Sequence, residues 1–582
     1  MAGNSRTRKA GRLTRVVLLA SVATVSPAAA LAIRAQPQTT GVVRAQTDSV
    51  ASQIRSALGG GVPDGISVAA WERTRRVYAT FGDTLLWPVA GVRRGLAPRA
   101  ATLVRTIASS AAEGLRPADY PLAEIARLAN AVQQNGAGDA SEARLDILLT
   151  GTLSAFASDR LRGRVSPRSV EPAWHIDPER VNVDSAVVAT IRDRDLSAAL
   201  NRLRPRTEGY DALVAGLARY QQFVRRGGWA ELPAGPVLRP GDRSPRVLAV
   251  RRRLAAEDFR IMDHHEPGTD DDLYDAGLAR AVAAFQTRHG LTIDSIVGPR
   301  TRAALNVSAA RREQQIAANL ERLRWLPPRL GDRYVVVNIP AFRLDAYDHG
   351  QRALSMPVIV GADYGHRATP IFSDSMRYVV FNPYWNVPAS IAVREILPDA
   401  RRDADFLARN GYEIVKGWSQ QRVHPAVLRD DDFRSYRYRV RQRPGRGNAL
   451  GRVKFIFPND YNVYLHDTPL GELFSSARRA FSHGCIRVAE PAALAEFVLG
   501  PQGVTPAAID RLLAGNVRQE IDLARAVPVF IVYLTAFAGD DGSVMFREDL
   551  YDRDDALVRA LRPEPFTITH HAAPGRRAGG RS

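Results

Sequence analysis

The chain has 582 residues, enough for three or four domains, and its 45% hydrophobic composition supports folded cores. It carries 80 Lys and Arg against 61 Asp and Glu, a formal net charge of +19, and nearly all of its cations are arginines. Its single cysteine excludes a disulfide within the chain.

Residues 1–34 have the pattern of an export signal. Basic residues come first, an apolar stretch from Val16 to Val25 follows, and small residues then run from Pro27 to Ala32. Cleavage after Ala30 or Ala32 fits this pattern, and retention of the segment as an N-terminal membrane anchor is the alternative. The apolar core is short for a membrane span, which needs about 20 residues.

The predicted export limits the anionic partners that the positively charged protein can meet. Outside the cytoplasm a cationic protein meets anionic lipid and carboxylate-rich wall polymer, so we expect no nucleic-acid partner. A solvated surface with a general arginine bias explains the charge equally well.

Four regions follow the signal. Residues 48–230 show apolar positions at helical spacing and predict a helical domain. After a linker rich in Gly and Pro, residues 238–308 predict a compact module of three helices. From 333 to 551 the period changes to that of strands, with a polar, Arg-rich interruption at 394–446 that we interpret as an inserted lid. Residues 552–582 form a tail whose Arg- and Gly-rich end we expect to be disordered.

The stretch from 464 to 488, YLHDTPLGELFSSARRAFSHGCIRV, holds the only cysteine, Cys485. A cysteine without a disulfide partner in an exported protein indicates a functional thiol. Two histidines that could act on this thiol lie near it in sequence. The thiolate is the attacking form of cysteine, and a histidine within reach can take the thiol proton. We favour His466, at the end of an apolar strand, over His483, because residues two apart on an extended segment lean alongside each other. A buried, inert cysteine and a zinc site are the alternatives, although the spacing lacks the paired ligands of structural zinc sites.

His466, fifteen intervening residues and the sequence Ser482-His483-Gly484-Cys485-Ile486-Arg487 resemble the signature of the L,D-transpeptidases, cysteine enzymes that cross-link peptidoglycan. Many members carry Asn at the position of Arg487, and the larger members often carry Arg. Residues 113–120 and 163–167 are similar to the scaffold domain of those larger members, and 238–308 resembles the three-helix peptidoglycan-binding module. The resemblance implies a multidomain α+β protein: a helical scaffold, this module, and a β-rich catalytic domain with an inserted lid.

The resemblance also implies roles for single residues. Cys485 would attack the amide before the terminal D-Ala of a tetrapeptide stem, and His466 would take the thiol proton while the backbone carbonyl of Asp467 orients its ring. The N–H groups of Gly484 and Cys485 would hold the oxyanion. We expect five further residues to bind substrate, namely Ser482, His483, Arg487, Trp385 and Asn386.

By the same resemblance, an amine of a second stem would resolve the thioester into a 3–3 cross-link in the periplasm or cell envelope. Carbapenems would acylate the thiol, and we expect no metal or organic cofactor. Two alternatives stay open: an L,D-carboxypeptidase, in which water is the acceptor, and a catalytically inactive wall-binding protein.

Overall fold

The structure of the chain is a computed structural model. It describes residues 51–88, 96–135, 140–176, 181–257, 272–365, 367–419, 421–424 and 429–562. The export signal predicted at 1–34 and the end of the tail lie outside the described residues. Within those ranges, no helix is both long enough and apolar enough to cross a membrane.

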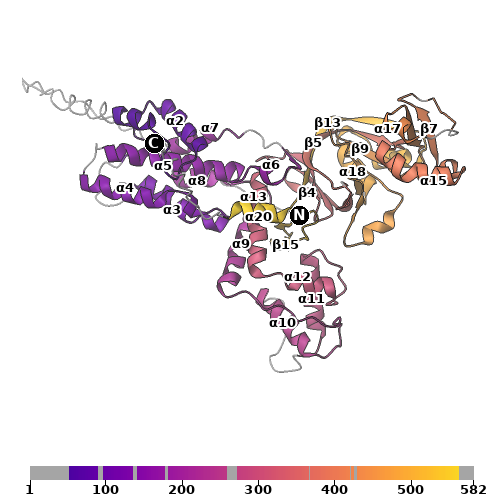
Figure 1. The fold of residues 1–582 in the computed structure, drawn as a ribbon, viewed down its shortest axis with the longest axis horizontal. Helices are drawn as coiled ribbons and strands as arrows, with labels where there is room; N and C mark the ends of the chain where they lie inside the picture. The colour runs from indigo at the N-terminus through magenta and orange to yellow at the C-terminus, as the bar shows by residue number, and fades with distance from the viewer. Residues whose placement is uncertain are drawn as a thin grey trace, which may run out of the picture. The chain divides into compact units, whose positions relative to one another are not determined.

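The first part of the described chain is helical, as predicted. Its helices share one core, in which α5 is buried on most sides between its neighbours. Side-chain caps begin several of them; Ser67, for example, accepts a hydrogen bond from the N–H of Ala70 (3.2 Å) at the start of α2. The helices are α2 (Val68–Phe81), α3 (Pro98–Ala108), α4 (Leu122–Asn135), α5 (Ala140–Arg162), α7 (Val183–Arg192) and α8 (Leu196–Arg202), which Figure 1 labels.

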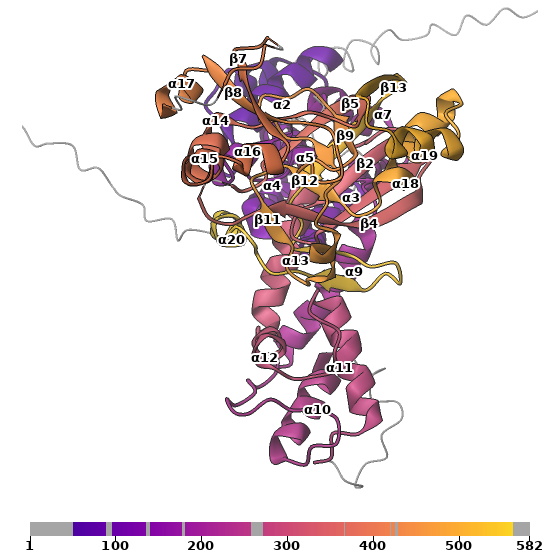
Figure 2. The ribbon, with the colours of Figure 1, turned by 90° about the vertical axis from the view of Figure 1, so that its right-hand side faces the viewer.

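Two further helices, α9 (Tyr210–Arg225) and α13 (Ala309–Arg324), lie side by side in both ribbon views (Figures 1 and 2). Their apolar faces join the core of the β-rich domain rather than the core of the first helices. Buried charge is paired where these parts meet, because an isolated buried charge is costly. Glu321 on α13 binds Arg324 (3.1 Å) and accepts the N–H of Val165 (2.9 Å).

The predicted three-helix module consists of α10 (Pro245–Glu257), α11 (Ala276–Arg288) and α12 (Pro299–Leu305) around a small core of its own. The buried side chain of Gln286 links the second helix of the module to the third and to the segment that leads into it. It donates hydrogen bonds to Asp294 (2.7 Å) and Thr301 (3.2 Å) and accepts one from the N–H of Ser295 (2.9 Å). Gln286 is therefore the hydrogen-bonded centre of the module.

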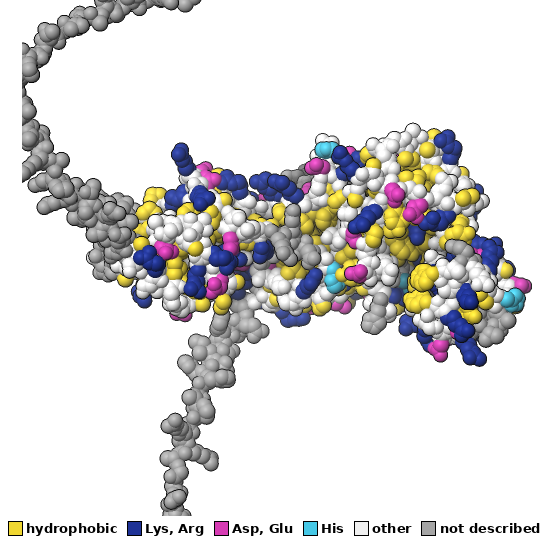
Figure 3. Space-filling model, turned by 90° about the horizontal axis from the view of Figure 1, so that it is seen from above, with side chains coloured by type: hydrophobic (Ala, Val, Ile, Leu, Met, Phe, Trp, Pro, Cys, Tyr) yellow, Lys and Arg dark blue, Asp and Glu magenta, His cyan; other side chains and the backbone are white. Residues whose placement is uncertain are grey.

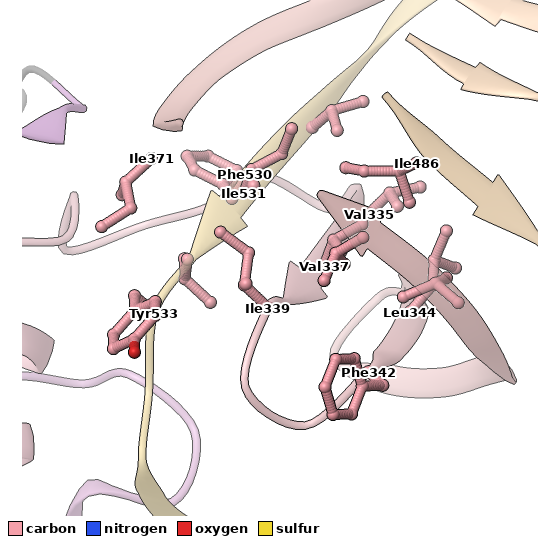
Figure 4. Packing of buried hydrophobic residues seen from close by; sticks show 14 of the residues in the cluster. Val335, Val337, Ile339, Phe342, Leu344, Ile371, Ile486, Phe530, Ile531 and Tyr533 are labelled. Atoms are coloured by element: carbon pink, nitrogen blue, oxygen red, sulfur yellow. The ribbon is translucent and has the colours of Figure 1, made fainter. Parts of the chain in front are cut away.

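The β-rich domain is built on one sheet that closes on itself. Its strand order is β1-β5-β13-β2-β3-β4-β12-β10-β9, and β9 also pairs with β5. Inward-facing residues such as Val335, Val337, Leu344 and Ile531 pack in its interior (Figure 4). The strands are β1 (Trp174–His175), β2 (Arg333–Asn338), β3 (Arg343–Asp348), β4 (Gln351–Gly361), β5 (Ile371–Phe381), β9 (Val453–Ile456), β10 (Leu465–His466), β12 (Ile486–Val488) and β13 (Gln519–Val532), while β11 (Ala480–Ser482) pairs with β4.

The interruption at 394–446 and the residues 385–393 before it form a small subdomain, called the insert below, with a separate apolar core. It holds the three-stranded sheet β6-β8-β7, with β6 (Trp385–Asn386), β7 (Tyr412–Lys416) and β8 (Tyr438–Gln442). Figure 2 shows its helices gathered beside β7 and β8: α14 (Ala389–Ile391), a π-helical turn (Ala392–Ile396), α15 (Leu397–Arg402), α16 (Phe406–Arg409) and α17 (Asp430–Arg434). The insert is thus a folded unit.

The last described elements complete the domain. They are α18 (Pro491–Leu499), α19 (Pro506–Ala514), the hairpin of β14 (Ala536–Ala538) and β15 (Val544–Phe546), and α20 (Asp554–Leu561). Basic side chains are scattered over the face seen in Figure 3, with acidic ones among them, rather than gathered in one patch. The multidomain α+β architecture predicted from the sequence is confirmed.

Candidate active site

Three neighbouring strands bring the candidate residues together. Strand β10 lies between β9 and β12, and the register sets His466 opposite Arg487 on one side and Lys454 on the other. Side chains alternate along strands, so Tyr464 shares the face of His466, and Cys485 shares the face of Arg487. The thiol and the imidazole therefore project from the same face of the sheet.

His466 is buried, with 4% of its surface exposed, and its Nδ1 lies 2.5 Å from the carbonyl oxygen of Asp467. A carbonyl only accepts hydrogen bonds, so Nδ1 carries the proton and Nε2 keeps its lone pair. Burial lowers the pKa of His466 to about 3, and the positive charges of Arg487 and Lys454 act in the same direction. The ring is thus held neutral, in the tautomer that a base needs.

Asp467 fixes the carbonyl that orients this ring. Its carboxylate accepts the N–H groups of Arg452 (2.7 Å) and Thr468 (2.7 Å). A Cβ at position 451 would lie 2.3 Å from the Asp467 side chain, so glycine is required there for the close approach. Burial raises the pKa of Asp467, while the two N–H groups oppose that shift.

Cys485 is partly buried, and its Sγ lies 3.5 Å from the carbonyl oxygen of Asn462. Burial raises the pKa of the Cys485 thiol. Hydrogen bonds from Tyr464 and the positive charges of Arg487 and Lys454 lower this pKa, but their effect is smaller than that of burial. With a raised thiol pKa and a lowered imidazole pKa, the resting pair is neutral rather than a thiolate and an imidazolium.

Tyr464 and Lys454 are two site residues that sequence reasoning missed. The Lys454 Nζ lies 5.5 Å from the centre of the Tyr464 ring, and that ring lies 5.7 Å from the ring of His466. Strand alternation could have found Tyr464, two residues before His466. Lys454 required knowledge of which strand pairs with β10.

Gly484 has a φ of 117°, in the region that favours glycine. Its N–H donates to the Ser482 hydroxyl (3.1 Å), and its carbonyl accepts from the Thr369 hydroxyl (2.9 Å). The Ser482 hydroxyl in turn donates to the Cys485 carbonyl. Ser482 therefore shapes the loop around the thiol, and the N–H of Gly484 already has an acceptor within this loop.

His483 points toward the insert. Its Nε2 lies 2.7 Å from a carboxylate oxygen of Glu395, which also binds Arg367 at 2.9 Å. Glu395 sits in the π-helical turn of the insert, an irregularity that is frequent at functional sites. This contact joins the insert directly to the segment that carries Cys485.

The other predicted residues are Trp385 and Asn386, in the insert, and Arg487, which lies opposite His466. Trp385 and Asn386 form β6 in the insert sheet, where Trp385 packs near Tyr412 with ring centres 6.3 Å apart. The Nε of Arg487 is buried without a hydrogen-bond partner among the described residues. Those residues also hold no group of three or more His, Cys, Asp or Glu side chains that could bind a metal.

Three known protein families match consecutive parts of the chain. Residues 332–523 match the L,D-transpeptidase catalytic domain, 72–217 match a scaffold domain, and 243–305 match the family described as "Putative peptidoglycan binding domain". The chain therefore carries an L,D-transpeptidase catalytic domain together with a scaffold domain and a peptidoglycan-binding domain.

Two curated relatives match shorter stretches. A Haemophilus influenzae protein named "Putative L,D-transpeptidase" is 34% identical over 242 residues, 41% of this chain and 48% of that protein. The N-acetylmuramoyl-L-alanine amidase CwlM of Mycobacterium tuberculosis is 40% identical over 83 residues, 13% of this chain and 20% of that protein. The chain thus spans about half of the first relative and a fifth of the second.

Two solved structures are similar at a low level. One is the L,D-transpeptidase (residues 123-326) from Xylanimonas cellulosilytica, with 16% identity and a TM-score of 0.16, covering 52% of this chain and 100% of that chain. The other is a fused Zn-dependent amidase/peptidase/peptidoglycan-binding domain-containing protein from Clostridium acetobutylicum, with 13% identity and a TM-score of 0.16, covering 51% and 100%. Neither similarity bears on the function.

Proposed function

We propose that the protein is a peptidoglycan L,D-transpeptidase that forms 3–3 cross-links through a thioester on Cys485. The observation that carries the proposal is the position of the His466 imidazole: its Nδ1 lies 2.5 Å from the Asp467 carbonyl oxygen, and it projects from the same sheet face as the only thiol of the sequence. Because peptidoglycan lies outside the cytoplasm, the site of action is extracellular or periplasmic. A cleaved signal or an anchor at residues 1–34 belongs to the same proposal.

In the first step the Cys485 thiol loses its proton to Nε2 of His466 as sulfur attacks the carbonyl carbon before the terminal D-Ala. The imidazolium then returns this proton to the leaving amine, the C–N bond breaks, and D-Ala departs. A thioester and a neutral imidazole remain. Lys454 and Arg487 favour the negative charge that sulfur and oxygen carry on the way.

In the second step the amine of another stem attacks the thioester carbon. His466 removes a proton from this amine, the C–S bond breaks, and the thiolate takes that proton. The product is an amide between two stems. We assign the oxyanion to the N–H of Cys485, and also to that of Gly484 once it leaves the Ser482 hydroxyl.

We assign residues 394–446 of the insert the role of a lid that holds the acidic stem and excludes water. Glu395 would latch it to His483, and Arg367, Trp385 and Asn386 would border the groove. Much of the positive charge of the insert is already paired internally, for instance in Arg422–Glu413 (2.8 Å) and Arg401–Asp430 (2.5 Å). The insert would therefore act mainly by covering the groove and excluding water, and less by electrostatic attraction of the acidic stem.

A carbapenem tests the proposal in its simplest form. Intact-mass spectrometry after incubation should show one covalent adduct on the full chain and none on Cys485→Ala. An unmodified wild-type mass would contradict an active cysteine and would favour an inactive wall-binding protein. If an adduct forms but stem peptides are only trimmed to tripeptides, the activity is that of an L,D-carboxypeptidase.

A further inference from the structure

A cavity of about 820 Å³ lies between the three-helix module and the β-rich domain. Its walls come from residues 289–304 of the module, the start of α13, residues 477–478 and residues 546–554. Ligand pockets of proteins occupy about 300 to 1,000 Å³ and occur preferentially at such domain boundaries. Its size and position are therefore those of a binding site.

Arg300 and Arg547, both on the cavity wall, form no ion pair with an acidic side chain among the described residues. The side chain of Arg300, exposed on α12, has neither an ion pair nor a hydrogen bond within the described ranges. The guanidinium of Arg547 donates only to the carbonyls of Arg288 (3.0 Å) and Phe546 (2.6 Å). Burial lowers the pKa of Arg547 to about 10, and two further arginines add repulsion. A half-buried cation that lacks a counter-charge favours an anionic ligand.

The wall holds five arginines against four acidic side chains, and three of these four acids already accept hydrogen bonds within the protein. Asp549 accepts the Tyr533 hydroxyl (2.6 Å), Asp554 accepts the Thr535 hydroxyl (2.7 Å), and Asp294 accepts from Gln286. Only Glu548 has no partner among the described residues of the wall. Apolar surface fills much of the remainder, from Leu291, Ile296, Pro299 and Pro340.

The cavity also reaches the segment between the two candidate catalytic residues. Arg478 lines it and pairs with Asp363 (2.7 Å), and the next residue, Arg479, accepts the N–H of Val360 through its carbonyl (2.9 Å). Strand β11 follows at once and ends at Ser482. A ligand in this cavity would thus contact the module and the segment that leads to the thiol.

We propose that this cavity binds a carboxylate-bearing peptide, namely an acidic stem of the wall polymer, apart from the groove at Cys485. The guanidiniums of Arg300 and Arg547 bind its carboxylates, and the apolar wall packs against its alanine methyl groups. The identity of the ligand as a wall stem rests on the proposed function. The module then holds one stem while another reacts.

The test uses the full chain with its groove blocked. N-ethylmaleimide alkylates the single cysteine, and fluorescence anisotropy then measures binding of a labelled muramyl tetrapeptide. We expect saturable binding to the blocked protein, weakened about tenfold by Arg300→Glu, as for loss of a charged hydrogen bond. Arg300→Lys should retain most of the affinity, and Arg252→Glu, an exposed charge reversal on α10, should leave it unchanged.

Two results would overturn the site: no saturable binding to the blocked protein, or equal affinity of the Arg300→Glu and Arg252→Glu variants. Cross-linking of stems by the unblocked enzyme is measured separately, so failure of the cavity and failure of the transpeptidase activity are distinguishable. A cavity that binds the probe in an inactive enzyme would leave this inference standing and remove only the proposed reaction.

Discussion

The hydroxyl of Thr369 is a buried bridge that supports the segment around the thiol, and its removal gives a sharp test. Thr369 is fully buried, accepts the N–H of Gly361 (2.9 Å) and donates to the carbonyl of Gly484 (2.9 Å). Valine has nearly the same shape and lacks the hydroxyl. Thr369→Val would therefore leave a buried donor and a buried acceptor without partners.

The magnitude follows from those two groups. Each unsatisfied buried group costs about 1–3 kcal/mol, so the two together cost about 2–6 kcal/mol if they act independently. For a domain of this size each kcal/mol lowers the melting temperature by about 2–4 °C, so the smallest expected drop is about 4 °C. The Gly484 carbonyl would also lose its position beside Cys485, which should slow acylation.

Differential scanning fluorimetry and the rate of carbapenem acylation measure the two effects. Thr369→Ser is the matched control, because it keeps the hydroxyl and loses one methyl group, a cost of about 1 kcal/mol. We expect the valine variant to be the less stable and the slower of the two. If both variants melt together and acylate at the wild-type rate, the bridge does not support the site.

Three further predictions concern the site itself. His466→Ala should slow carbapenem acylation by a factor of about 100 or more, whereas His483→Ala should slow it far less; equal losses in stopped-flow acylation would reverse the assignment. Burial raises the thiol pKa of Cys485 and the resting pair is neutral, so alkylation by iodoacetamide should accelerate nearly tenfold per pH unit from about pH 7 to about pH 8.5. A rate that is already constant near pH 7 would indicate a thiolate–imidazolium ion pair instead. Glu395→Gln keeps the shape of the insert and weakens its charged contact with His483, so hydrolysed stems should rise relative to dimers; an unchanged product ratio would remove the latch.

Much of the fold was predictable because its signals are local. The strand at β2, the helix at α18 and the three-helix module follow from apolar periodicity and turn residues within short windows. Cys485 and His466 were predictable as a pair from their residue types and spacing, with the resemblance to a family adding their roles.

What the sequence could not indicate depends on long-range pairing. Closure of the sheet through β9 and β5, and the position of Lys454 opposite His466, require the strand order, which periodicity does not contain. The contact of Glu395 with His483 joins residues 88 positions apart. Strand β13 ends at Val532, and the side chains of Asn338 and Asn319 then accept the backbone N–H groups of Leu534 and Thr535 from distant parts of the sequence.

In the proposed reaction, Cys485 forms a thioester that the amine of a second stem resolves. The most direct test of this reaction is incubation of a purified disaccharide-tetrapeptide with the full chain and with Cys485→Ala, followed by liquid chromatography and mass spectrometry of the products. We expect 3–3 dimers with one released D-Ala per cross-link from the wild-type enzyme, and neither product from the variant. Dimers from Cys485→Ala, or no reaction of the stem with a wild-type protein shown to be folded, would contradict the proposed reaction.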